Sequence, residues 1–150
     1  LRASVELGVS SVTSLTTDRC VIKKHPAKTK SERWKKIVLE SSKQCGRAKV
    51  PLVADDIESL EEFCRNNDDR DIKLVFWENE SNNSLKNIKL DQVPCSVAVL
   101  IGPEGGFSLD EINIVRDYGF QTVRMGPRII RAETAPVVVL ALLQSSWGDL

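Results

Sequence analysis

Two strings in the second half of the sequence carry the residue types that could do chemistry. The first, residues 101–108 (IGPEGGFS), is rich in glycine and directly follows the apolar segment 97–100. Because glycine has no Cβ, backbone N–H groups in such a turn can approach a bound small molecule closely. The second string, residues 125–135 (MGPRIIRAETA), carries two arginines and one glutamate. Both strings have the composition of ligand-binding loops.

Each string lies between an apolar, strand-like run and a helix-like run. Loops that follow the carboxyl ends of neighbouring parallel strands commonly form one ligand site. The sequence therefore predicts one shared site for a nucleotide-like cofactor, and it contains no Walker or Gly-x-Gly-x-x-Gly string that would indicate an ordinary triphosphate or dinucleotide. The candidate residues, which would supply backbone donors and acceptors and apolar walls, are Leu100, Ile101, Gly102, Pro103, Glu104, Gly105, Gly106, Met125, Gly126, Ile129, Ile130 and Ala135.

The elements that must position these loops alternate between strands and helices. This alternation predicts an α/β fold with a mostly parallel sheet flanked by helices. The expected strands cover residues 12–15, 20–22, 72–77, 97–101 and 120–125. The expected helices cover residues 31–45 with Ser31 as the N-cap, a segment that Asp55 or Asp56 would cap, residues 108–118 with a Ser108–Glu111 capping box, and residues 136–147 after a Thr134 cap. We expect loops over 23–30 and 78–92, and 78–92 is expected to be the least ordered segment.

Length and composition narrow the class of protein. A chain of 150 residues is long enough for one domain with a real core, and no apolar run is long enough to cross a bilayer. One histidine, His25, and four widely spaced cysteines argue against a metal site and for reduced thiols in the cytosol or another reducing compartment. The chain starts at Leu1, and its first residues read like the tail of a helix closed by Gly8, so we expect a fragment of a longer protein.

Charge is distributed unevenly although the formal net charge is zero. Residues 19–49 hold eleven Lys or Arg against two Glu, whereas residues 55–71 are mainly acidic. A basic stretch of this kind fits a nucleic-acid footprint on one face. It fits equally well a solvated helix face next to a basic loop, so charge alone leaves both interpretations open.

The two strings, taken in this order and spacing, resemble a known family. Residues 100–112 (LIGPEGGFSLDEI) and 125–135 are similar to the bacterial 16S ribosomal RNA uridine N3-methyltransferases, the RsmE-type enzymes of the SPOUT superfamily. Residues 6–9 (ELGV), 17–20 (TDRC) and 40–51 (ESSKQCGRAKVP) are similar to the same family. The resemblance spans essentially the whole chain.

This resemblance implies a homodimeric enzyme that uses S-adenosylmethionine and has a deep trefoil knot in its carboxyl-terminal segment. It implies one SPOUT methyltransferase domain over residues 1–150, which in the family follows an RNA-binding barrel and a first strand that this chain lacks. The implied substrate is N3 of a uridine in 16S ribosomal RNA, with ribosomal RNA or the small subunit as partner, in the cytoplasm or in an organelle of a eukaryote. The chain departs from the usual family pattern at Lys43, Ile130 and Ala132.

Methylation of uridine N3 requires removal of an imide proton while negative charge develops on the base. A guanidinium aimed at that charge would stabilise it, and Arg131 is the first candidate. Glu104 and Glu133 are the carboxylates that could accept the proton or orient the base. Glu133 could equally be structural, bonded to backbone N–H groups at the start of the last helix.

For the RNA strand, we expect phosphate contacts from basic and polar side chains that position it without reading its sequence. The candidates are Arg19, Lys23, Lys24, Arg33, Gln44 and Arg47. Two other functions compete with the methyltransferase: a non-catalytic RNA-binding module with the same fold, and a metabolic α/β enzyme that uses a nucleotide cofactor. Binding of S-adenosylmethionine, or turnover of a small metabolite, would separate the three.

Overall fold

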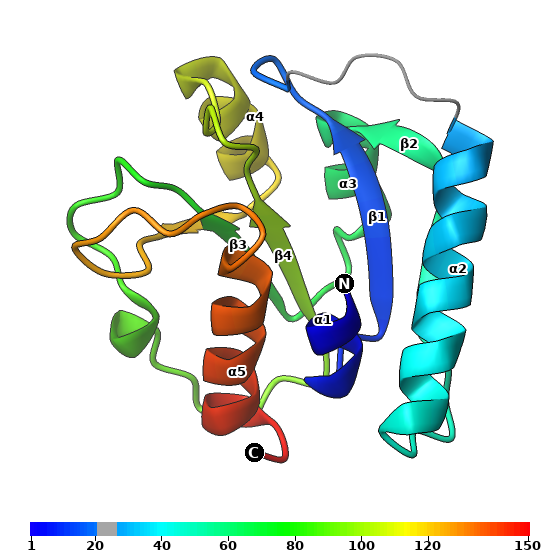
Figure 1. Cartoon of the computed structure of the whole chain (residues 1–150). Coiled ribbons are helices and arrows are strands. Elements are labelled where there is room, and N and C mark those ends of the chain that lie inside the picture. The colour runs from blue at the N-terminus through cyan, green and yellow to red at the C-terminus, as the bar shows by residue number, and fades with distance from the viewer. Residues whose placement is uncertain (21–26) are drawn as a thin grey trace. The chain divides into compact units, whose positions relative to one another are not determined.

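The computed structural model describes residues 1–20 and 27–150 (Figure 1). Side chains are described for residues 1–20 and 30–150. The chain divides into two compact units. The first holds Leu1–Thr16, Ile22–Glu58 and Pro136–Leu150, and the second holds Thr17–Val21 and Ser59–Ala135. None of the helices in the described ranges has the length and apolar character that crossing a membrane would need.

The second unit is built on a parallel sheet of three strands in the order β4-β3-β5. These strands are β3 (Ile72–Phe76), β4 (Val97–Ile101) and β5 (Gln121–Val123). They are rich in β-branched and other apolar residues, and they fill much of the core; Leu74, Val75 and Leu100 are at most 1% exposed. The predicted parallel sheet is confirmed, with β5 shorter than the expected 120–125.

Two helices of the second unit, α3 (Leu60–Asn66) and α4 (Leu109–Asp117), contact each other, and α4 also contacts β5. Each begins with a complete capping box, in which a serine at the N-cap and a glutamate three residues later exchange hydrogen bonds with backbone N–H groups. The predicted cap of α4 is confirmed. Its apolar face, including Ile112 and Val115, is fully buried.

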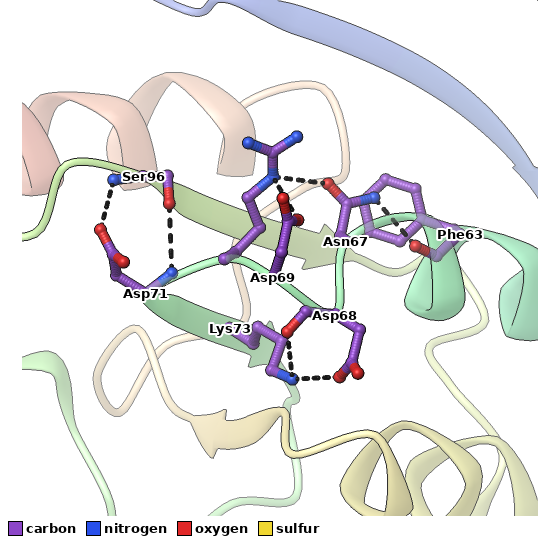
Figure 2. A network of polar contacts seen from close by, with 8 residues as sticks. Phe63, Asn67, Asp68, Asp69, Asp71, Lys73 and Ser96 are labelled. Atoms are coloured by element: carbon purple, nitrogen blue, oxygen red, sulfur yellow. Dashed lines mark hydrogen bonds and ion pairs between the residues drawn. The ribbon is translucent and has the colours of Figure 1, made fainter.

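Hydrogen bonds at the amino-terminal edge of this sheet fix the starts of β3 and β4 (Figure 2). The Asp71 carboxylate accepts from the backbone N–H groups of Cys95 at 2.8 Å and Ser96 at 3.0 Å, and the Asp71 N–H donates to Ser96 Oγ at 3.1 Å. Lys73 Nζ lies 2.8 Å from the Asp68 carboxylate. Part of the acidic stretch therefore serves to join strands and the turn before them.

The first unit contains α1 (Arg2–Glu6), β1 (Ser11–Thr16), α2 (Ala27–Gln44), most of β2 (Leu52–Ser59) and most of α5 (Ala135–Trp147). β1 and β2 form a two-stranded sheet, and the Leu52 N–H donates to the Ser10 carbonyl where both strands begin. Gly8 follows α1 with φ +87°, as expected for the glycine that closes a helix.

The predicted start of the long helix is wrong. α2 begins at Ala27, so residues 27–30 are helical rather than part of a loop. Ser31 is no N-cap, since its hydroxyl donates to the Asp55 carboxylate at 3.3 Å. The first turn of α2 carries alanine and lysines, which favour a helix but lack the apolar spacing that marks one in a sequence. Of the strand expected over 20–22, Cys20 lies outside any strand, and the other two residues lie outside the described ranges.

The predicted cap at Asp55 or Asp56 is also wrong. Both aspartates lie within β2, where the Asp55 carboxylate pairs with Lys35 Nζ, and the helix begins only at Leu60. Ser59 is the N-cap. Aspartate is common at helix starts and rare in strands, so the local preference pointed to the wrong element.

All four cysteines are free thiols. Cys64 is fully buried, and this burial raises the pKa of its thiol to about 11. Cys45 and Cys95 are exposed.

Candidate functional site

Three loops leave the same edge of the parallel sheet. Phe76 at the end of β3 pairs with both Ile101 at the end of β4 and Val123 at the end of β5. The three strands therefore stop in register, and the segments that follow them start side by side. This register supports the prediction that the two strings contribute to one site, and it adds a third segment, residues 77–84, which follows the central strand.

The glycine turn is built as the sequence predicted. The Gly106 N–H donates to the Pro103 carbonyl at 2.9 Å, and Gly106 has φ +68°, a conformation that favours glycine. Phe107 is 2% exposed and anchors the turn, while Glu104 and Gly105 are exposed. The turn thus projects a short, exposed backbone segment from a buried base.

Asp18 and Arg19 contact this turn and the start of the helix that follows it. The Arg19 guanidinium donates to the Gly105 carbonyl at 3.0 Å. The Asp18 N–H donates to Glu111 at 2.8 Å, and the Ser108 hydroxyl donates to Asp18 at 2.8 Å. Arg19, a predicted RNA contact, therefore bonds directly to the predicted cofactor turn.

The second string forms an exposed loop between β5 and α5. Ile129 is 89% exposed, and the Arg131 and Glu133 side chains are 85% and 70% exposed. Their charged groups lie 3.9 Å apart, a weak pair at this exposure. The Arg131 carbonyl accepts from the N–H groups of Thr134 and Ala135, both at 2.9 Å, which fixes the backbone at the start of α5.

One glutamate near the turn lies outside the predicted set. The Glu78 carboxylate, directly after β3, lies against Gly106, since a Cβ built on that glycine would come within 1.9 Å of Glu78 Oε1. The sequence signal for Glu78 was weak: it follows a buried strand, at a position that the family resemblance places near the site. Gly106 therefore has two reasons to be glycine: its positive φ and the carboxylate beside it.

Residues 1–144 match the model of a family described as the RNA methyltransferase domain. The chain belongs to this family. It is 35% identical over its whole length to the ribosomal RNA small subunit methyltransferase E of Buchnera aphidicola, of which it covers 60%.

Solved structures agree with this membership. A putative methyltransferase from Legionella pneumophila, solved with S-adenosylmethionine bound, aligns with a TM-score of 0.90 and 36% identity over 99% of this chain and 60% of that one. A ribosomal RNA small subunit methyltransferase E from Neisseria gonorrhoeae, also bound to S-adenosylmethionine, aligns with a TM-score of 0.82 and 33% identity over the same shares. This RNA methyltransferase domain spans about 60% of the length of these relatives.

The predicted RNA contacts of the RNA methyltransferase domain divide between the two units. Arg19 belongs to the second unit, whereas Arg33 and Gln44 are exposed on α2 in the first. Lys23 and Lys24 lie outside the described residues.

Arg47, the remaining candidate, has structural partners. Its Nη1 donates to the Val5 carbonyl at 2.9 Å and the Val9 carbonyl at 2.7 Å, which ties the end of α1 to the segment after α2. We expect Arg47→Ala to lower the free energy of unfolding by about 2 kcal/mol and the melting temperature by about 4–8 °C. Differential scanning calorimetry measures both.

Arg33→Ala is the matched control, because Arg33 is exposed on α2 and its loss should leave the melting temperature nearly unchanged. An unchanged melting temperature for Arg47→Ala would mean that its two hydrogen bonds add no net stability.

The loop after β3 is better anchored than its polar composition predicted. The Glu80 carboxylate, 8% exposed, accepts from the Thr122 hydroxyl and from the N–H groups of Asn82 at 2.8 Å and Asn83 at 3.1 Å. These bonds, chiefly the one from Thr122, lower the pKa of Glu80 to about 2. A short 3₁₀ helix at Leu85–Asn87 follows, so residues 78–92 contain local structure that we did not expect.

A cavity of about 300 Å³ lies beside this network. It is lined by Asn83, Ser84, Asn87, Ile88, Arg116, Phe120, Gln121, Thr122 and Val123. No predicted cofactor residue is among them, so the exposed loops rather than this cavity form the candidate site. Within the described ranges, no cluster of His, Cys, Asp or Glu could hold a metal ion.

The low pKa of Glu80 gives a pH prediction. Because the folded pKa lies below the ordinary 4.5, the ionised carboxylate stabilises the fold fully above pH 4.5, and this contribution is lost as the pH falls toward 2. Glu80→Gln should cost about 2 kcal/mol at pH 7. Urea unfolding at pH 7, 5 and 3 should show the difference in unfolding free energy between wild type and variant narrowing at pH 3, and a difference independent of pH would contradict this role.

Proposed function

We propose that this RNA methyltransferase domain transfers a methyl group from S-adenosylmethionine to N3 of a uridine in 16S ribosomal RNA. The observation that carries the proposal is the in-register end of β3, β4 and β5, which starts the glycine turn and the Arg131 loop at one edge of the sheet. Relatives named ribosomal RNA small subunit methyltransferase E, one of them solved with this cofactor, support the same function.

The residues at this edge fit a nucleoside cofactor. The turn exposes backbone at Gly105, and Gly126 is exposed; apart from its chain neighbours, no atom of the described residues lies within 4 Å of the position a Cβ would take there. The exposed Ile129 side chain offers an apolar surface to a base. When bound, S-adenosylmethionine would supply an electrophilic methyl group.

The chain's own residues would supply the rest of the chemistry. N3 of uridine carries a proton that must leave before the nitrogen can act as a nucleophile. Glu104, exposed on the glycine turn, and Glu133, beside Arg131, are the carboxylates available to accept it. Arg131 would stabilise the negative charge that spreads over N3 and the flanking carbonyl oxygens.

The family supports further proposals for this chain. We propose that it forms a homodimer, that its carboxyl-terminal segment is threaded as a deep trefoil knot, and that it works in the cytoplasm or organelle where ribosomal RNA is assembled. The RNA strand would contact exposed side chains such as Arg33 and Gln44.

The test is mass spectrometry of nucleosides from 16S RNA and small subunits after incubation with the purified protein and a labelled methyl donor. We expect one added methyl group on a uridine at N3. A methyl group on another atom or base would overturn the proposed substrate. Absence of transfer together with no calorimetric binding of S-adenosylmethionine would favour the non-catalytic RNA-binding module.

A further inference from the structure

Glu78 holds a carboxylate at the centre of the site edge. It follows β3, the middle strand of the sheet, and the preceding Trp77 N–H donates to the Val123 carbonyl at 3.0 Å. Both carboxylate oxygens face Gly106, at 1.9 and 2.9 Å from the position its Cβ would take. The carboxylate is therefore in contact with the glycine turn of the neighbouring strand β4.

This carboxylate has no structural partner in the described parts of the chain. No hydrogen bond or ion pair there involves Glu78, and its side chain is exposed. Two other carboxylates of this unit differ: Glu80 accepts three hydrogen bonds, and Glu111 accepts from the backbone N–H groups of Asp18 and Ser108. Those two carboxylates hold loops in place, whereas the oxygens of Glu78 are available to a ligand.

We propose that Glu78 accepts hydrogen bonds from the ribose hydroxyls of the cofactor, an inference that rests on the proposed function. An ionised carboxylate only accepts, so the ligand group that meets it must donate. Two carboxylate oxygens match two neighbouring hydroxyls. The same logic operates in dinucleotide-binding folds, where an acidic residue after one strand binds the ribose and a glycine turn after the adjacent strand approaches the rest of the cofactor.

The experiment is isothermal titration calorimetry of the purified protein with S-adenosylhomocysteine, which keeps the ribose and lacks the sulfonium charge. Glu78→Gln keeps the side-chain shape and removes the charge, and it should weaken binding on the order of 10- to 100-fold. Glu61→Gln, an exposed glutamate on α3, is the matched control and should bind as wild type does. Equal melting temperatures of the unliganded variants would show that the fold is intact.

Ligand variants identify the group that Glu78 meets. The 2′-deoxy and 3′-deoxy forms of S-adenosylhomocysteine should bind wild type more weakly than S-adenosylhomocysteine does. For Glu78→Gln, removal of either hydroxyl should cause little further loss of affinity. If Glu78→Gln binds S-adenosylhomocysteine normally, or if only S-adenosylmethionine is weakened, the ribose assignment is overturned while the proposed function stands. If wild type binds neither S-adenosylhomocysteine nor S-adenosylmethionine, the proposed function itself is overturned.

Discussion

Replacing Arg131 with alanine should slow methyl transfer by about 100- to 1000-fold while cofactor affinity changes little. The reason is positional. The Arg131 carbonyl is held by two N–H groups at the start of α5, so the backbone is fixed, whereas its guanidinium is 85% exposed and bears only a weak pair with Glu133. The substitution therefore removes a positive charge from the site and leaves the backbone hydrogen bonds at the start of α5 in place. Single-turnover rates and calorimetric affinities, measured on the same preparations, separate the two effects.

Arg128→Ala is the matched control for Arg131. Both arginines are exposed and lie in the loop between β5 and α5, so the net charge and loop composition change equally. We expect Arg128→Ala to keep a rate within a few-fold of wild type. A large loss of cofactor affinity in Arg131→Ala, with a normal rate at saturation, would assign Arg131 to binding instead.

Gly105→Val should abolish measurable cofactor binding. A Cβ at Gly105 would lie 3.0 Å from the Cβ of Arg19 and 3.4 Å from its carbonyl oxygen, and neither atom can rotate away. The two γ-carbons of valine would worsen the overlap, so the turn must shift away from its hydrogen bond with Arg19. Binding is lost because the turn is displaced. The valine side chain itself would face Arg19 and not the ligand. Titration with S-adenosylhomocysteine measures the loss.

Gly105→Ala provides a graded comparison at the same position. Its single Cβ needs only a shift of a few tenths of an ångström, so we expect a modest loss of affinity between wild type and Gly105→Val. If Gly105→Val binds the cofactor as wild type does, the turn is not part of the site.

Helices and strands were predicted most accurately where the local residue pattern matches the role of the segment in the fold. β3 and β4 lie where the apolar runs indicated, and Ser108 caps α4, because buried parallel strands and capping boxes each have a short-range signature. The start of α2 and the identity of β2 were mispredicted because the deciding contacts are distant in sequence, as in the bond from Ser31 to Asp55.

The candidate site shows the same division. The sequence was enough to find the glycine turn and the Arg131 loop, because the two strings occur together, each after an apolar run, although either string alone would be a weak signal. The contacts of Glu78 with Gly106 and of Arg19 with Gly105 join segments far apart in the chain, and no local pattern reports them. The structural contacts of Arg47 were missed for the same reason, because its carbonyl partners lie about 40 residues upstream.

The two oxygens of Glu111 serve segments that are distant in the chain. One accepts from Ser108 three residues away, and the other accepts from Asp18 across 93 residues. Closing so long a loop costs chain entropy before any contact offsets it, so the local cap can form early whereas the bond to Asp18 must wait. The glycine turn should therefore gain its final shape among the last events of folding, once residues 17–20 have arrived.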